Sequence, residues 1–166
     1  MKVIFLDIDG VLNYQRISER APSGCIGISD TCCERLARIV AVTDAKLVLT
    51  STWKRDWQKG ISTEELPRDG QYLVNKLLKH RLTIYDKTVD PSWAERGVGI
   101  INYLSTVAHP VDSFIILDDE RYDFKEQGLA DHLVQTQFSA TDNFDEPGLQ
   151  DKHVRKAVRL LNDSKS

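Results

Sequence analysis

The sequence predicts an α/β domain built on a doubly wound, mostly parallel sheet with helices on both faces. Two observations support this fold class. Short apolar runs alternate with helical patterns along the chain, which is the order that βαβ units produce. The three strongest runs, at residues 3–8, 46–50 and 113–118, are largely apolar without alternation, as expected for parallel strands that are covered on both faces.

The first helix is expected to begin at Ser29 or Asp30 and to end near Thr43. Ser29 and Asp30 are suitable N-cap residues, and Thr31 and Glu34 have the spacing of a capping box. Apolar residues recur at helical spacing in between, so one face of this helix should pack on the sheet.

The remaining elements are weaker strands and further amphipathic helices. A helix with apolar residues at Val98, Ile101 and Leu104 should precede the third strong strand. The others are expected, in chain order, as a helix that ends near His80, a strand at 82–85, a strand at 132–135 and a helix at about 151–162.

Length and composition are those of one globular domain spanning residues 1–166. The chain is 41% hydrophobic and 28% charged, which excludes disorder. The net charge of −3 excludes a globally cationic nucleic-acid coat but allows a local basic patch. The longest apolar runs are far shorter than the ~20 residues of a membrane span, and acids interrupt the N-terminal one too early for a signal peptide. Three cysteines without a C-x-x-C suggest a reduced, cytoplasmic protein.

Three predicted strands end in polar residues. The first ends with Asp7 and Asp9, the second with the hydroxyl residues 50–52, and the third with Asp118 and Asp119. Ligands of such sheets bind at the carboxyl edge of the strands. A single acidic pair there is often only a turn or a cap, but two pairs crowd four carboxylates together, which requires a proton or a cation. The sequence therefore predicts a Mg²⁺ site with a spare carboxylate for chemistry.

These residues resemble the motifs of the haloacid dehalogenase (HAD) superfamily. Residues 5–12 (FLDIDGVL) are similar to its first motif, 47–50 (LVLT) to its second and 115–119 (IILDD) to its fourth. The resemblance implies a three-layer, Rossmann-like fold. The intervals between the motifs leave no room for a large cap domain. Residues 49–54 (LTSTWK), together with Arg96-Gly97 before a helix, further resemble small capless HAD domains of RNA-repair proteins.

The resemblance implies a role for each motif residue. Asp7 would be the nucleophile that forms an aspartyl-phosphate, and Asp9 would act as general acid and then general base. Thr50 would bind a phosphoryl oxygen, with Ser51 as the alternative. Mg²⁺ would be held by Asp118, Asp119, Asp7 and the backbone carbonyl of Asp9.

The third motif should supply a cation against the phosphoryl group. Arg96 is the first choice, because it precedes the helix that leads to the third strong strand, and Lys87 is the rival. The alternative for Arg96 is a solvated charge at the end of a helix.

An open site without a cap suits a macromolecular end better than a small metabolite. Lys54, Arg55 and Trp57 follow the second motif, where they could grip backbone phosphates and stack on a base of a phosphorylated polynucleotide end. The alternative is that the aromatic residues here, Trp53 included, pack in the core while the charges are solvated.

The expected function is thus a Mg²⁺-dependent HAD-like phosphatase of phosphomonoesters. Three alternatives are a catalytically idle module that binds phosphorylated ends, a phosphatase of proteins or small metabolites, and a dehalogenase. The paired aspartates and the inferred metal disfavour the dehalogenase, which would need neither Asp9 nor Mg²⁺.

Overall fold

The centre of the protein is a five-stranded parallel sheet. The computed structural model describes residues 1–140 and 146–163. In sheet order the strands are β3 (Ile84–Lys87), β2 (Lys46–Leu49), β1 (Lys2–Leu6), β4 (Ser113–Asp118) and β5 (Leu133–Gln135). The doubly wound sheet expected from the sequence is confirmed, and β1 lies in its middle between β2 and β4.

The strands are continuously apolar because both faces of the sheet are covered. Along β1, Ile4 and Leu6 belong to one core cluster, whereas Val3 and Phe5 belong to the other. Side chains of a strand alternate between its two faces, so neither face of β1 is left to water. All four side chains are fully buried.

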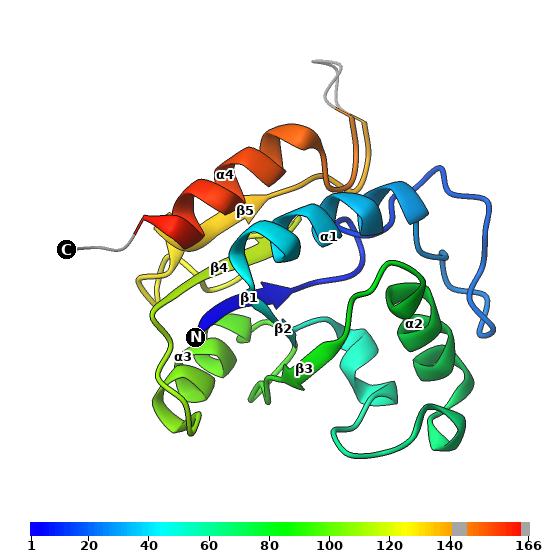
Figure 1. The fold of residues 1–166 in the computed structure, drawn as a ribbon, viewed down its shortest axis with the longest axis horizontal. Helices are drawn as coiled ribbons and strands as arrows, with labels where there is room; N and C mark the ends of the chain where they lie inside the picture. The colour runs from blue at the N-terminus through cyan, green and yellow to red at the C-terminus, as the bar shows by residue number, and fades with distance from the viewer. Residues whose placement is uncertain (141–145, 164–166) are drawn as a thin grey trace.

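Helices form the outer two layers (Figure 1). α1 (Asp30–Thr43) and α4 (Asp151–Asn162) lie side by side over one face, and α3 (Arg96–Thr106) covers the other. α2 (Arg68–Lys79) packs against the short helix η1 (Thr52–Asp56) that follows β2. This three-layer arrangement is the predicted one.

The start of α1 differs in detail from the expectation. Ser29 is the N-cap, and its Oγ accepts a hydrogen bond from the backbone N–H of Cys32 at 3.2 Å. The spacing of Thr31 and Glu34 therefore does not mark a capping box, because both residues lie inside the helix after its cap. The expected span of the helix, to Thr43, is confirmed.

β3 begins two residues later than expected. Arg81 adopts a left-handed conformation with φ +60°, and the N–H of Leu82 still bonds to the Leu77 carbonyl at the end of α2. Leu82 therefore closes the helix, and the strand starts at Ile84.

α3 buries a face that is shifted from the predicted one. Ile101 is 39% exposed, whereas Leu104 packs on the core as expected, together with Ile100 and Tyr103. Gly97 and Gly99 are also buried, and a side-chain carbon at Gly99 would lie 2.0 Å from Oδ1 of Asp90. The two glycines thus let the helix approach its neighbours closely.

No large cap is inserted into this domain. The segment between β1 and β2 holds a loop and α1, and the segment between β2 and β3 holds η1, the short helix η2 (Thr63–Glu65) and α2. In residues 1–140 and 146–163, no helix has both the length and the apolar character required to cross a membrane.

Candidate active site

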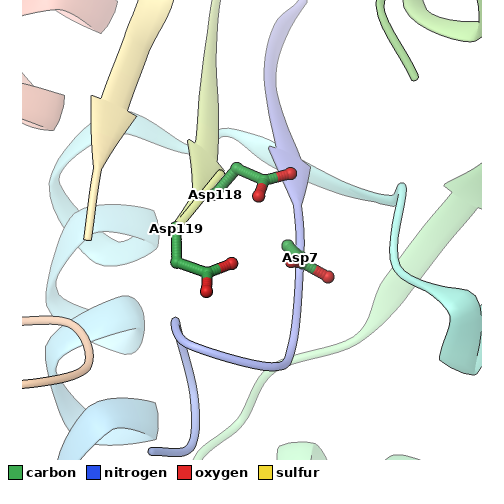
Figure 2. Close-up of side chains that lie close together, drawn as sticks. All are labelled: Asp7, Asp118 and Asp119. Carbon is green, nitrogen blue, oxygen red and sulfur yellow. The ribbon is translucent and has the colours of Figure 1, made fainter. Parts of the chain in front are cut away.

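Three carboxylates gather at the carboxyl edge of the two central strands. Asp118 ends β4 and Asp119 follows it, while Asp7 follows β1 with its N–H bonded to the Leu117 carbonyl at 2.9 Å. One carboxylate oxygen from each aspartate lies within 4.8 Å of the others (Figure 2). The predicted meeting of the first and fourth motifs is therefore present in the structure.

Arg96 lies against two of these carboxylates. Its Nη1 is 3.0 Å from Oδ2 of Asp7 and 2.7 Å from Oδ2 of Asp118. Arg96 is the first residue of α3 and is only 5% exposed, so it is not the solvated helix-end charge that the sequence allowed. Lys87 instead donates to the backbone carbonyls of Lys54 and Trp57, at 3.0 and 2.6 Å. The structure thus places Arg96, and not Lys87, beside Asp7.

The charges of this cluster do not balance. Three carboxylates face one guanidinium, and burial raises the pKa of Asp7 although Arg96 opposes the shift. Burial, and after it the charge of Asp7, raise the pKa of Asp118 to about 8 and that of Asp119 to about 6. A divalent cation would remove this excess negative charge. The close, oxygen-only donor set fits Mg²⁺, and Asp7, Asp118 and Asp119 are the side chains that would hold it.

Asp9 lies outside this cluster and has different partners. Its Oδ1 accepts a hydrogen bond from Nδ2 of Asn13 at 2.8 Å, and its Oδ2 accepts one from Nε1 of Trp53 at 3.2 Å. The expected convergence of four carboxylates is therefore corrected to three. β1 ends at Leu6, so the two-residue alternation of a strand does not extend to Asp9.

The loop after Asp7 is built around Asn13 and Gly10. Oδ1 of Asn13 accepts from the N–H of Gly10 at 3.0 Å, and Thr136 after β5 donates to the Gly10 carbonyl at 2.6 Å. Gly10 has φ +80°, and a side-chain carbon there would lie 2.4 Å from Cγ of Asp119. Only glycine allows this conformation and this approach, so Gly10 lets the first motif pack on Asp119.

Thr50 and Ser51 have distinct surroundings. Ser51 Oγ accepts from the N–H of Trp53 at 3.3 Å and caps η1. The Thr50 hydroxyl is buried and has no hydrogen-bond partner among the described residues. A buried hydroxyl without a partner is costly, and a phosphoryl oxygen would satisfy it.

Thr50 also lines a cavity of about 230 Å³. Lys54 forms part of its wall, where its Nζ donates to Thr88 at 3.1 Å and forms an ion pair with Asp90. The lining combines polar, charged and aromatic side chains: Thr50, Thr52, Lys54, Asp90, Ser92, Trp93 and Arg96. An anion in this cavity would lie beside two cations, Lys54 and Arg96, and one carboxylate, Asp90.

Two of the predicted substrate-binding residues lie elsewhere. Trp57 is 8% exposed and packs in the hydrophobic core, so the expectation that it stacks a base is wrong, because its faces are covered. Arg55 is exposed and forms an ion pair with Asp56 at 3.4 Å. It lines neither this cavity nor a second, larger cavity formed by Trp93, Tyr122 and neighbouring residues.

Several residues of the candidate active site were not identified from the sequence. Asn13 lies six residues after Asp7, and a polar residue at the end of the apolar run 11–12 was the available signal. Trp53 was considered only as a stacking or core residue, whereas its indole N–H bonds to Asp9. Thr136 and Trp93 carried no local signal, because their neighbours are distant in sequence.

The fold and the site together define a HAD-superfamily domain. Paired aspartates follow β1 and β4, a buried hydroxyl follows β2, and no large cap interrupts the sheet. Residues 3–154 match the family model described as the HAD domain in Swiss Army Knife RNA repair proteins, and the chain belongs to this family. No curated protein and no solved structure matches the chain.

The excess of carboxylates predicts that Mg²⁺ stabilises the fold, and more so at high pH. Protons on Asp118 and Asp119 are held with a pKa of about 8 and about 6, above the unfolded value near 3.8. Their stabilising contribution is complete below that unfolded value and is lost as the pH rises through about 6 to about 8. Mg²⁺ must displace these protons. At a concentration of 100 Kd it should add about 2.7 kcal/mol, or roughly 5–10 °C in Tm for a domain of this size.

Thermal unfolding at pH 5.5 and pH 8, with and without Mg²⁺, measures this effect. The variant Asp118→Asn/Asp119→Asn is the control and should show little response to Mg²⁺. An equal shift in this variant, or a larger shift at pH 5.5 than at pH 8, would contradict the proposed set of metal ligands.

Proposed function

We propose that the protein is a Mg²⁺-dependent phosphatase that hydrolyses a phosphomonoester at a nucleic-acid end through an aspartyl-phosphate. One arrangement carries the proposal. Asp7 forms an ion pair with Arg96, and Arg96 lines a cavity together with Thr50, whose buried hydroxyl has no hydrogen-bond partner among the described residues. A phosphoryl group in this cavity would lie beside Arg96 and Thr50, and the ion pair with Arg96 would hold the Asp7 carboxylate close by as nucleophile.

Asp7 is suited to the role of nucleophile because its carboxylate is fixed from two sides. Oδ1 accepts a hydrogen bond from the N–H of Ile8 at 2.9 Å, and Oδ2 contacts Arg96. In the first step an Asp7 oxygen attacks phosphorus, and the bond from phosphorus to the leaving oxygen breaks. Thr50 donates to a phosphoryl oxygen.

Asp9 is suited to proton transfer because it is half-buried and lies outside the cluster of three carboxylates. It gives its proton to the leaving oxygen, so that an alcohol departs. It then takes a proton from a water molecule, which attacks phosphorus. The bond from phosphorus to Asp7 breaks, and inorganic phosphate and the free Asp7 carboxylate result.

Mg²⁺, when bound by Asp7, Asp118 and Asp119, would offset the repulsion between the nucleophile and the phosphoryl oxygens. The assignment of the Asp9 carbonyl as a further ligand stays a prediction from the resemblance.

A nucleic-acid end is favoured as substrate by the family and by the open edge of the sheet. The family model is that of a domain of RNA repair proteins, and no large cap is inserted between the strands to enclose a small metabolite. Lys54 in the cavity wall would supply a second cation to the terminal phosphate.

Substitution by asparagine should impair different steps of the reaction at the two aspartates of the first motif. Asp7→Asn should lower kcat for an aryl phosphate at least about 10³-fold and abolish the phosphoenzyme, because an amide does not attack phosphorus. Asp9→Asn should lower kcat about 10²- to 10⁴-fold, most for poor leaving groups. Rapid quench with ³²P-labelled substrate measures both.

The wild type should lose activity on chelation and regain it with Mg²⁺. Near-normal turnover by Asp7→Asn would show that the nucleophile is misassigned. An inactive wild type that still binds the phosphorylated end would favour the idle binding module.

Trp53 is proposed as a positioning residue for Asp9. Trp53→Phe removes one hydrogen bond to a carboxylate, worth about 1.5–3 kcal/mol, and should lower kcat about tenfold or more for poor leaving groups. The effect on activated aryl phosphates should be smaller, because they need less protonation. Trp57→Phe is the matched control, since Trp57 is similarly buried and follows the same short helix. Equal losses in both variants, independent of the leaving group, would indicate packing damage alone.

The substrate class is tested by comparing phosphomonoesters. We expect kcat/KM for an end-phosphorylated oligoribonucleotide to exceed that for sugar phosphates and phosphopeptides by at least about tenfold. Such a ratio corresponds to only about 1.4 kcal/mol of additional binding in the transition state. A preference for a phosphopeptide or a sugar phosphate would reject the nucleic-acid end and leave the phosphatase assignment intact.

A further inference from the structure

The three tryptophans differ sharply in exposure. Trp53 and Trp57 are 7% and 8% exposed, whereas Trp93 is 78% exposed. Trp93 lies between β3 and α3, in the segment that follows the carboxyl end of a strand. An exposed indole at this edge of the sheet presents a ring face beside the candidate active site.

Trp93 connects two cavities. It lines the 230 Å³ cavity that contains Thr50 and Arg96, and it also lines a second cavity of about 630 Å³. The second cavity is formed by Trp93, Ala94, Glu120, Tyr122, Asp123 and Glu126. The Tyr122 ring in its wall lies 4.4 Å from the guanidinium carbon of Arg96. The larger cavity therefore adjoins the 230 Å³ cavity, and Trp93 lines both.

The charge of the larger cavity is opposite to that of a phosphate site. Its lining has three acidic side chains and no basic one. Asp123 is engaged, since its carboxylate accepts from the N–H groups of Gly97 and Val98 at 2.6 and 3.1 Å. Glu120 and Glu126 are exposed at the rim. A second phosphate group would be repelled here, whereas an uncharged group with hydrogen-bond donors would be accepted.

We propose that this larger cavity is a subsite for the terminal nucleoside of the substrate, and this rests on the proposed function. The base stacks on Trp93, and the two rim glutamates accept hydrogen bonds from hydroxyl or amino groups of the nucleoside. The cavity recognises the uncharged part of the terminal nucleotide, and the internucleotide phosphate lies outside it.

A quaternary ammonium group fits the geometry less well than a nucleoside. Such cations are bound by several aromatic faces that form a cage. Here Trp93 offers an exposed ring, and the Tyr122 ring already has Arg96 over it. The volume of about 630 Å³ is also large for a small ammonium group. Phosphocholine, which carries a quaternary ammonium group, is therefore included in the test as a competing substrate.

The stacking is tested with Trp93→Ala, Trp93→Phe and the matched control Val89→Ala. Val89 is also 78% exposed and lies in the same connection, but it lines neither cavity. For adenosine 3′- or 5′-monophosphate, Trp93→Ala should lower kcat/KM at least about fivefold, and Trp93→Phe should restore much of the loss. Because Trp93 also lines the smaller cavity, the decisive measure is the ratio of kcat/KM for adenosine monophosphate to that for ribose 5-phosphate, which should fall in Trp93→Ala.

The acceptor role of the rim is tested with Glu126→Ala, against Glu64→Ala on η2 as the control. For adenosine monophosphate, Glu126→Ala should lower kcat/KM at least about threefold, because one hydrogen bond is lost, while Glu64→Ala leaves it unchanged. Equal effects of the two substitutions would overturn this role of Glu126. Equal losses for Trp93→Ala and Val89→Ala would overturn the stacking, and a preference for phosphocholine would overturn the nucleoside.

Binding separates this proposal from the proposed function. Calorimetry with Asp7→Asn and adenosine monophosphate should show binding that Trp93→Ala weakens at least about fivefold. If the wild type hydrolyses no phosphomonoester but this difference in binding persists, the phosphatase fails and the subsite stands. If an aryl phosphate is hydrolysed with Mg²⁺ and the difference is absent, the subsite fails and the phosphatase stands.

Discussion

A buried guanidinium at the centre of this protein is shared by two buried carboxylates, with a third, half-buried carboxylate beside them. Arg96 can face Asp7 and Asp118 together only because β1 and β4 are parallel neighbours whose carboxyl ends meet. Removing one member of such a group leaves an uncompensated charge. The start of α3 is correspondingly fixed, with Asp123 accepting from its first N–H groups. The remaining negative charge is what would favour a divalent cation at this edge of the sheet.

The two aspartates of the first motif are separated by their environments rather than by their chemistry. Asp7 is buried against Arg96, while Asp9 is half-buried between Asn13 and Trp53. Two carboxyl groups placed in different surroundings can take different roles in one reaction. The loop that enforces this difference depends on Gly10, whose left-handed backbone lets Asp119 approach. The two environments on which the proposed roles of Asp7 and Asp9 depend are thus created by a few residues of one turn.

The two cavities beside the site differ in charge. Lys54 and Arg96 line the smaller cavity, whereas acidic groups line the larger one on the other side of Trp93. A ligand with one anionic end and one uncharged, aromatic end matches this order. Because no large cap is inserted in the domain, the selectivity must come from the strand-end loops themselves. The exposed indole of Trp93 lies between these two regions of opposite charge, and the proposed nucleoside subsite would give it a function.

The apolar runs in the sequence predicted the parallel sheet and the order of its elements. The polar residues at the ends of these runs identified the first, second and fourth motifs. Both signals are local in sequence. The sequence favoured Arg96 over Lys87 as the cation beside Asp7, but only the tertiary structure shows that Arg96 contacts Asp7 while Lys87 donates to backbone carbonyls elsewhere. The tertiary structure also buried Trp57, exposed Trp93 and turned Trp53 toward Asp9. Such outcomes depend on contacts between residues that are distant in sequence, such as Asp9 and Trp53, which are 44 positions apart, and no local pattern encodes them.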